Sequence, residues 1–163
     1  MGKNTLDREL PKDTFAAIGE VIVHWSHLET LIDVAIYSMM GLKPSKGAWI
    51  TTGLRFNGKM GTLQSIAINF FKGKKDTLDL FNKQVGEIQH CYGERNRIDH
   101  AIWWHLGPDA FPSLRVRVTA QNISPPEVNQ MGPKEIRRIG ERISKAMHSF
   151  NDFLEKHTPP PPS

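Results

Sequence analysis

The chain has 163 residues, and its 21 lysines and arginines against 17 aspartates and glutamates give a formal net charge of +4. Hydrophobic residues make up 39% of it and charged residues 23%, the usual balance of one globular domain. There is no apolar run of membrane-spanning length, no signal-peptide pattern and only one cysteine, so we expect a cytoplasmic protein without disulfides or a membrane partner. The charge favours an anionic partner such as nucleic acid, although many unrelated proteins carry as much.

Residues 1–12 are polar, and we expect them to form a flexible arm. Over residues 15–40, apolar side chains recur at spacings of three and four, which predicts a long amphipathic helix. Glu29 falls on the apolar stripe of this helix. A carboxylate in that position requires a cation from a neighbouring helix, and we expect Arg95 to supply it.

Residues 46–71 show an interrupted helical pattern, which fits two short helices or one kinked helix. A second long helix is predicted to follow and to end in the segment Glu94–His100, which concentrates polar and charged side chains. Continuing the apolar rhythm of this helix places Arg95 and Asp99 on its core-facing stripe. Buried charges are costly without partners, so the segment is either a structural ion-pair network or a functional site.

Beyond this helix the pattern changes to strict alternation. Residues 103–106 and 114–119, separated by the turn formers of residues 107–109, predict a β-hairpin with a basic outer face. Pro133 suits the first position of a final helix, whose apolar stripe continues to Phe153.

These elements predict a mainly α fold: an up-and-down helical bundle with a β-hairpin inserted between the motif helix and the last helix. We expect one domain over residues 13–157, preceded by the arm of residues 1–12 and followed by a Pro-rich tail over residues 158–163.

The residues Arg95, Asn96 and His100 resemble the Arg-x4-6-His motif of the HEPN superfamily, including the polar residue favoured directly after the arginine. The helical pattern of residues 15–155 is similar to that of the family as well. The resemblance implies a metal-independent endoribonuclease that needs no cofactor and works as a homodimer, in a toxin or defence role with a protein antitoxin as a further partner.

Two observations limit this resemblance. Arg142 and His148 fit the same motif, but Arg142 lies off the apolar stripe of its helix, so we assign this second match no function. Ile102 occupies the position where some HEPN toxins carry a tyrosine that a partner nucleotidyltransferase modifies, so we do not expect that form of control.

Cleavage of RNA by its own 2′-OH requires a base for the hydroxyl proton and a cation on the phosphate, roles that suit His100 and Arg95. Asn96 is expected to orient His100, with Glu29 and Asp99 in support. Positions five apart on a helix point about 140° from each other, so either the helix ends near Asp99 or a second copy completes the site.

Further contacts to RNA are expected from cations and an aromatic ring on and after the motif helix, namely Arg97, Trp103, Arg115 and Arg117. The rival interpretation is a non-catalytic bundle that binds a nucleotide or a protein partner, in which the charged residues are purely structural. A metal site formed by His24, His27 and His100 is a third interpretation, but no cysteine or cluster of acids completes it.

Overall fold

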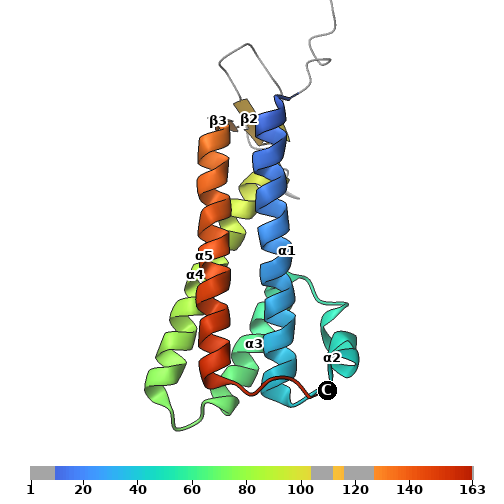
Figure 1. Ribbon diagram of the computed structural model, residues 1–163, viewed down its shortest axis with the longest axis vertical. Helices are drawn as coiled ribbons and strands as arrows, with labels where there is room; N and C mark the ends of the chain where they lie inside the picture. The colour runs from blue at the N-terminus through green and yellow to red at the C-terminus, as the bar shows by residue number, and fades with distance from the viewer. Residues whose placement is uncertain (1–9, 104–111, 116–126, 163) are drawn as a thin grey trace, which may run out of the picture.

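The computed structural model describes residues 10–103, 112–115 and 127–162, and over these the protein is a helical bundle (Figure 1). The mainly α fold predicted from the sequence is therefore confirmed. The helices are α1 (Lys12–Met40), α2 (Pro44–Thr51), α3 (Phe56–Phe70), α4 (Lys75–Asp99) and α5 (Pro133–His157). Residues 1–9 of the expected arm lie outside the described part of the chain.

α1 is the central helix, because it contacts every other helix of the bundle. Its buried side chains follow spacings of three and four, as predicted: Ala17, Val21, Trp25, Leu28, Ile32, Ala35, Ile36 and Met39. The helix ends at Gly41, whose φ of 62° is a left-handed conformation that favours glycine. The next amide, of Leu42, donates to the Tyr37 carbonyl at 2.9 Å and closes the helix end.

The bundle does not alternate strictly up and down, which corrects the predicted arrangement. α1 and α5 run in the same direction, and Arg137 near the start of α5 binds Asp13 near the start of α1. α3 also runs with α1, because Phe56 at its start packs on Trp25 and Lys59 binds Asp33 further along. α4 is the one described helix of the four long ones that runs the opposite way.

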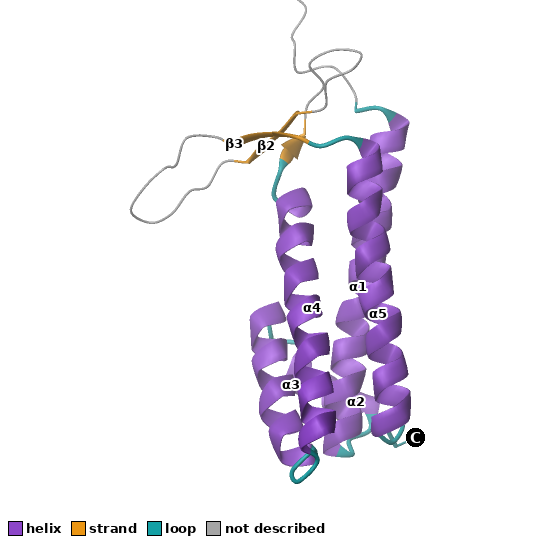
Figure 2. Ribbon diagram, turned by 90° about the vertical axis from the view of Figure 1, so that its left-hand side faces the viewer, coloured by secondary structure: helices purple, strands orange, loops and turns teal. Residues whose placement is uncertain are grey.

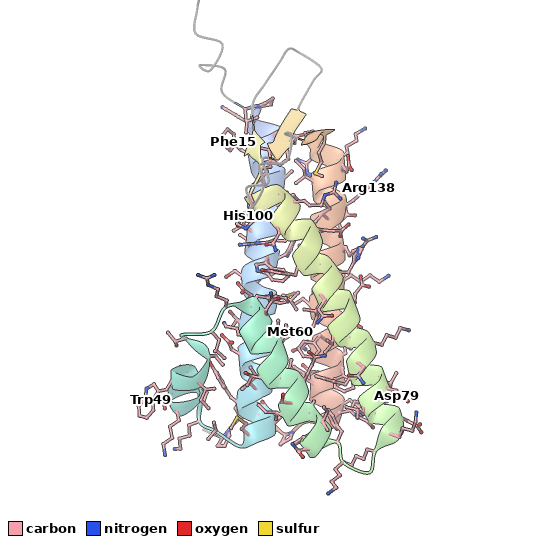
Figure 3. The ribbon with its side chains drawn as sticks, turned by 180° about the vertical axis from the view of Figure 1, so that it is seen from behind. Phe15, Trp49, Met60, Asp79, His100 and Arg138 are labelled. Carbon is pink, nitrogen blue, oxygen red and sulfur yellow. The ribbon has the colours of Figure 1, made fainter. Side chains whose placement is uncertain are left out.

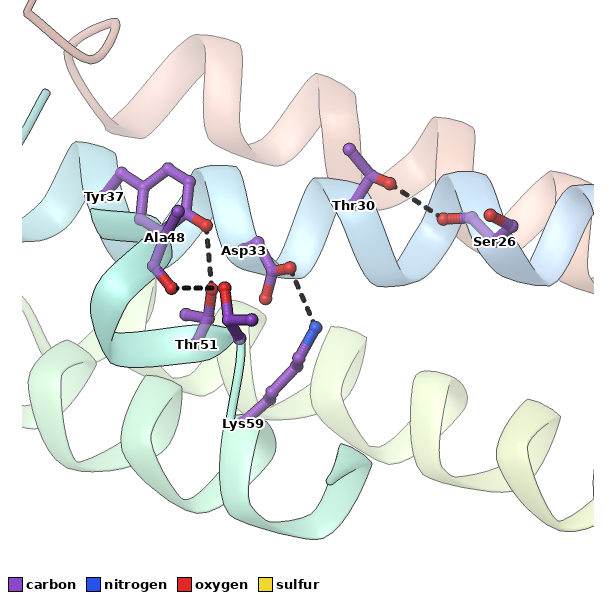
Figure 4. Close-up of polar contacts among 8 residues, drawn as sticks. Ser26, Thr30, Asp33, Tyr37, Ala48, Thr51 and Lys59 are labelled. Atoms are coloured by element: carbon purple, nitrogen blue, oxygen red, sulfur yellow. Dashed lines mark hydrogen bonds and ion pairs between the residues drawn. The ribbon is translucent and has the colours of Figure 1, made fainter. Parts of the chain in front are cut away.

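The short helix α2 explains why α3 runs parallel to α1. It folds back along the end of α1, where the Tyr37 hydroxyl lies 2.8 Å from Thr51 Oγ1 (Figure 4). Gly47 is buried directly against the Tyr37 ring, so the two helices approach more closely than a side chain would allow. The chain therefore returns toward the middle of α1 before α3 begins.

Three short strands lie across the end of the bundle where α4 finishes (Figure 2): β1 (Ile102–Trp103), β2 (Pro112–Arg115) and β3 (Glu127–Gln130). They pair antiparallel in the order β1-β2-β3, with Ile102 opposite Leu114. The turn of the predicted hairpin and most of its two strands lie outside the described residues. That hairpin stays a prediction.

The described side chains form one continuous core. At the end opposite the strands, three rings from α4, α5 and the residue after α3 pack together at centroid distances near 6 Å, namely Phe71, Phe81 and Phe153. No helix among the described residues is apolar over a stretch long enough to cross a membrane.

The contact between α2 and α1 gives a first prediction. A Cβ atom added at Gly47 would lie 2.1 Å from Cδ1 of the buried Tyr37 ring. We expect Gly47→Ala to lower the free energy of unfolding by about 1–3 kcal/mol, because the buried Tyr37 ring, whose hydroxyl contacts Thr51, or helix α2 would have to shift. Urea denaturation followed by circular dichroism measures this loss.

Gly61 provides the matched control. It lies inside α3 with no atom within 4 Å of an added Cβ. Gly61→Ala should be neutral or stabilising by up to about 1 kcal/mol, because alanine is the better helix former. Equal stability of the two variants would contradict the close packing of α2.

Candidate functional site

The candidate site lies where α4 ends. The amide of His100 donates to the Asn96 carbonyl at 3.2 Å, and the chain then leaves the helix toward β1. The indole N–H of Trp103 returns to the Ile98 carbonyl at 3.1 Å and satisfies one of the free acceptors of the helix end. The helix therefore ends at Asp99, which was one of the two possibilities that the spacing of Arg95 and His100 left open.

The Arg95 guanidinium has three partners, which are Asp99, Asn96 and the Trp25 ring. Its Nη1 lies 2.9 Å from Asp99 Oδ2 and donates to Asn96 Oδ1 at 3.1 Å. Its central carbon lies 5.9 Å from the centre of the Trp25 ring, within the range of a cation–π interaction. The side chain is only 21% exposed. Arg95 is thus fixed in orientation before any ligand binds.

Asp99 lies at the surface and not on the core stripe, which corrects the expected pattern. The buried residue at this level is Ile98, while the Asp99 side chain is 34% exposed. The reason is that the core face passes through Cys91 after Ile88, whereas the prediction passed through Tyr92. A shift of one residue turns the helix face by about 100°.

Glu29 does not pair with Arg95 as predicted. Among the described residues no hydrogen bond or ion pair to Glu29 is found, and Arg95 takes its partner from its own helix, four residues on. The Trp25 ring lies under the guanidinium, one turn before Glu29 on α1. The guanidinium of Arg95 therefore reaches Asp99, four residues later on α4, without passing across the Trp25 ring.

His100 is the accessible member of the site, with its side chain 67% exposed. Its Nδ1 lies 3.9 Å from Asp99 Oδ2, the same oxygen that contacts Arg95. Asn96 was expected to orient His100, but the hydrogen bond of its side chain is made with Arg95. Asp99 thus binds Arg95 and lies near His100 without a hydrogen bond to it.

The expected RNA-binding residues differ in exposure and in whether the structure describes their side chains. Arg97 is exposed and lines a hollow of about 500 Å³ beside α4, together with Asn96. Trp103 is half-buried against the core, with its N–H already bonded. Arg115 belongs to β2, but its side chain is outside the described part of the structure, and Arg117 lies outside it altogether.

The three-histidine metal interpretation finds no geometric support in the described residues. Within them, no three histidine, cysteine, aspartate or glutamate side chains come close enough together to hold a metal ion. This includes His24, His27 and His100.

A cluster that sequence reasoning missed joins α4 to α5. Arg142 donates to Glu94 Oε1 at 2.9 Å and contacts His90 Nε2 at 2.8 Å. Because an arginine can only donate, His90 Nε2 accepts and the ring proton lies on Nδ1. The spacing of four between His90 and Glu94 was the available signal, since it places both on one face of α4.

Comparison with known proteins adds no family to this site: no protein-family model, no curated protein and no solved structure matches the chain. The resemblance therefore rests on the motif at Arg95–His100 and on the helical pattern of residues 15–155. The function of the candidate site has to be inferred from the geometry of these side chains.

Cys91 lies on the buried face of α4, directly after His90, and gives a second prediction. Burial, together with the charges of Glu87 and Glu94, raises the pKa of its thiol to about 12. The thiol stays protonated at neutral pH, and only a thiolate is a good nucleophile. We expect iodoacetamide to label the native protein at pH 8 far more slowly than the protein in urea, as measured by mass spectrometry. Equal rates in the two states would show that Cys91 is accessible.

Proposed function

We propose that the protein is a metal-independent endoribonuclease of HEPN type, in which His100 acts as the base and Arg95 binds the scissile phosphate. The observation that carries the proposal is the Asp99 carboxylate. Its Oδ2 lies 2.9 Å from Arg95 Nη1 and 3.9 Å from His100 Nδ1, at the exposed end of α4 (Figure 3). A cation and an imidazole thus lie on either side of one carboxylate at an exposed helix end.

In the proposed reaction, His100 Nε2 takes the proton of a ribose 2′-OH, and the oxygen attacks the adjacent phosphorus. The new bond from the 2′-oxygen to phosphorus forms as the bond to the 5′-oxygen breaks. The products are a 2′,3′-cyclic phosphate and, after protonation by water, a free 5′-OH. The Asp99 carboxylate lies on the Nδ1 side of the ring, 3.9 Å from that nitrogen, and leaves Nε2 for the substrate.

Arg95 would stabilise the negative charge that builds on the phosphate oxygens. Asp99 and Asn96 occupy its Nη1, and the Trp25 ring supports the guanidinium plane. Because this arrangement is formed without ligand, little reorganisation is needed when a phosphate binds. The proposal includes a homodimer through α4, as the resemblance implies, which would present two copies of this arrangement to one RNA.

The remaining RNA contacts of the proposal come from Arg97, which is exposed beside the hollow, and from Arg115 and Arg117 of the predicted hairpin. Trp103 would contribute only its ring face, because its N–H is bonded to Ile98. The toxin or defence role, the cytoplasmic location and the protein antitoxin follow from the resemblance alone.

One observation favours the rival function, a non-catalytic bundle that binds a nucleotide or a protein. Arg95 already has three partners in the free protein, as a structural arginine would. The same residues would then bind a phosphate without cleaving it. Measuring cleavage separates the two functions.

The third prediction is that the purified protein cleaves single-stranded RNA in the presence of EDTA. His100→Ala and Arg95→Ala should each lower the rate about 100-fold or more, because a positioned acid–base group contributes about 10²–10⁴. The rates are read from denaturing gels with end-labelled RNA, and circular dichroism verifies that each variant is folded.

His148→Ala is the matched control, because His148 is an exposed helical histidine that, with Arg142, also fits the Arg-x4-6-His pattern. Its ring bonds to the Ser144 carbonyl of its own helix, so the change should leave cleavage within about twofold of the original rate. Full activity of His100→Ala would refute the assigned base. Absence of cleavage in every sample would favour the rival, and loss of cleavage in EDTA would revive the metal interpretation.

A further inference from the structure

A basic groove runs between α4 and α5 and has a volume of about 800 Å³. Its charged lining consists of four cations, Lys83, Arg138, Arg142 and Lys145, against two acids, Glu87 and Glu141. Two of its lining residues join the helices, because the Gln84 amide donates a hydrogen bond to Ser149 Oγ at 3.0 Å. The groove is therefore a built feature of two packed helices with an excess of positive charge.

The cations of α5 form a row along this groove. Arg138, Arg142 and Lys145 follow spacings of four and three, which places them on one face of the helix. The row spans seven residue steps, or about 10 Å along the helix axis. An extended polyanion lying along α5 can therefore contact more than one of these cations at once.

The Arg142 cluster connects residues that line the groove with residues that line the hollow beside the candidate site. Arg142 lines the groove and binds His90 and Glu94, both of which line the 500 Å³ hollow. Asn96 and Arg97, at the far side of that hollow, lie within one turn of His100. Arg138 lies toward the same end of the bundle as His100, on the neighbouring helix (Figure 3).

The cations on this path supply hydrogen-bond donors, and Glu87 and Glu141 supply acceptors beside them. Lys83, Arg138 and Lys145 carry only N–H donors and have no hydrogen bond or ion pair among the described residues. His90 accepts from Arg142 and therefore offers its Nδ1–H. Phosphodiester oxygens carry a negative charge and only accept hydrogen bonds, so a nucleic acid backbone is the complementary ligand.

We propose that the groove between α4 and α5 binds the backbone of the single-stranded RNA whose scissile phosphate lies at Arg95 and His100. This proposal rests on the proposed function for the identity of the ligand. The groove would hold the RNA flanking the cleavage site through its charge, with little dependence on base sequence.

The fourth prediction tests this groove with a fluorescein-labelled single-stranded RNA and fluorescence anisotropy at several salt concentrations. The parent protein is the His100→Ala variant, so that the RNA stays intact. Adding Arg138→Gln and Lys145→Gln should weaken binding roughly fivefold or more. It should also lower the slope of log K against log salt by about 1.4, which is 0.7 for each lost phosphate contact.

The matched control carries Lys46→Gln and Lys74→Gln on the same parent, two exposed cations on α2 and in the turn before α4, neither of which lines the groove. It has the same net charge as the double groove variant but should bind RNA within about twofold of the parent. Glu141→Gln should tighten binding, because it removes an acid from the groove.

The outcomes separate this proposal from the proposed function. Equal binding by the groove variant and the control would overturn the groove, even if the protein cleaves RNA. Weaker binding by the groove variant alone would support the groove, even if the protein with His100 intact proves unable to cleave. Absence of RNA binding would overturn the groove, and so would displacement of the RNA by polyglutamate at equal charge, which would assign the groove to acidic proteins.

Discussion

The Arg95 guanidinium lies over the Trp25 ring, where the aromatic cluster of Trp25, Phe56 and Tyr92 joins α1, α3 and α4. A cation that is only 21% exposed requires a nearby anion, and Asp99 supplies it one turn later on the same helix. Because α4 ends at Asp99, the next residue, His100, is left in solvent beside a carboxylate that Arg95 holds in place. The contact between Arg95 and the Trp25 ring therefore also sets the geometry of the candidate site.

Periodicity predicted the long helices because each buries one continuous stripe. α1 and α5 carry stripes that local spacing specifies fully, and Gly41 and Pro133 mark a helix end and a helix start for reasons of backbone conformation. The direction of α3 was beyond such patterns. It depends on the packing of Gly47 in α2 against Tyr37 in α1. A contact between two helices does not show in the hydrophobic periodicity of either one.

The candidate site likewise contains one contact that the sequence predicts and others that it does not. The pair of Arg95 and Asp99 was predictable because both lie on one helix at a spacing of four. The pairing of Glu29 was predicted wrongly, and the link from Arg142 to Glu94 was missed. Both depend on how a helix is rotated about its own axis, and an error of one residue in the stripe rotates it by about 100°. Contacts between helices therefore require the packed structure.

A catalytic histidine beside a phosphate-binding arginine uses the ribose itself as the nucleophile, so the ends of the products test the account most directly. Mass spectrometry of the RNA fragments should find a 2′,3′-cyclic phosphate on one and a 5′-OH on the other. An RNA with 2′-O-methyl groups throughout should bind but stay intact, because it has no hydroxyl proton for His100 to take. Fragments with 5′-phosphate ends, or cleavage of the methylated RNA, would contradict the assignment of His100 and Arg95.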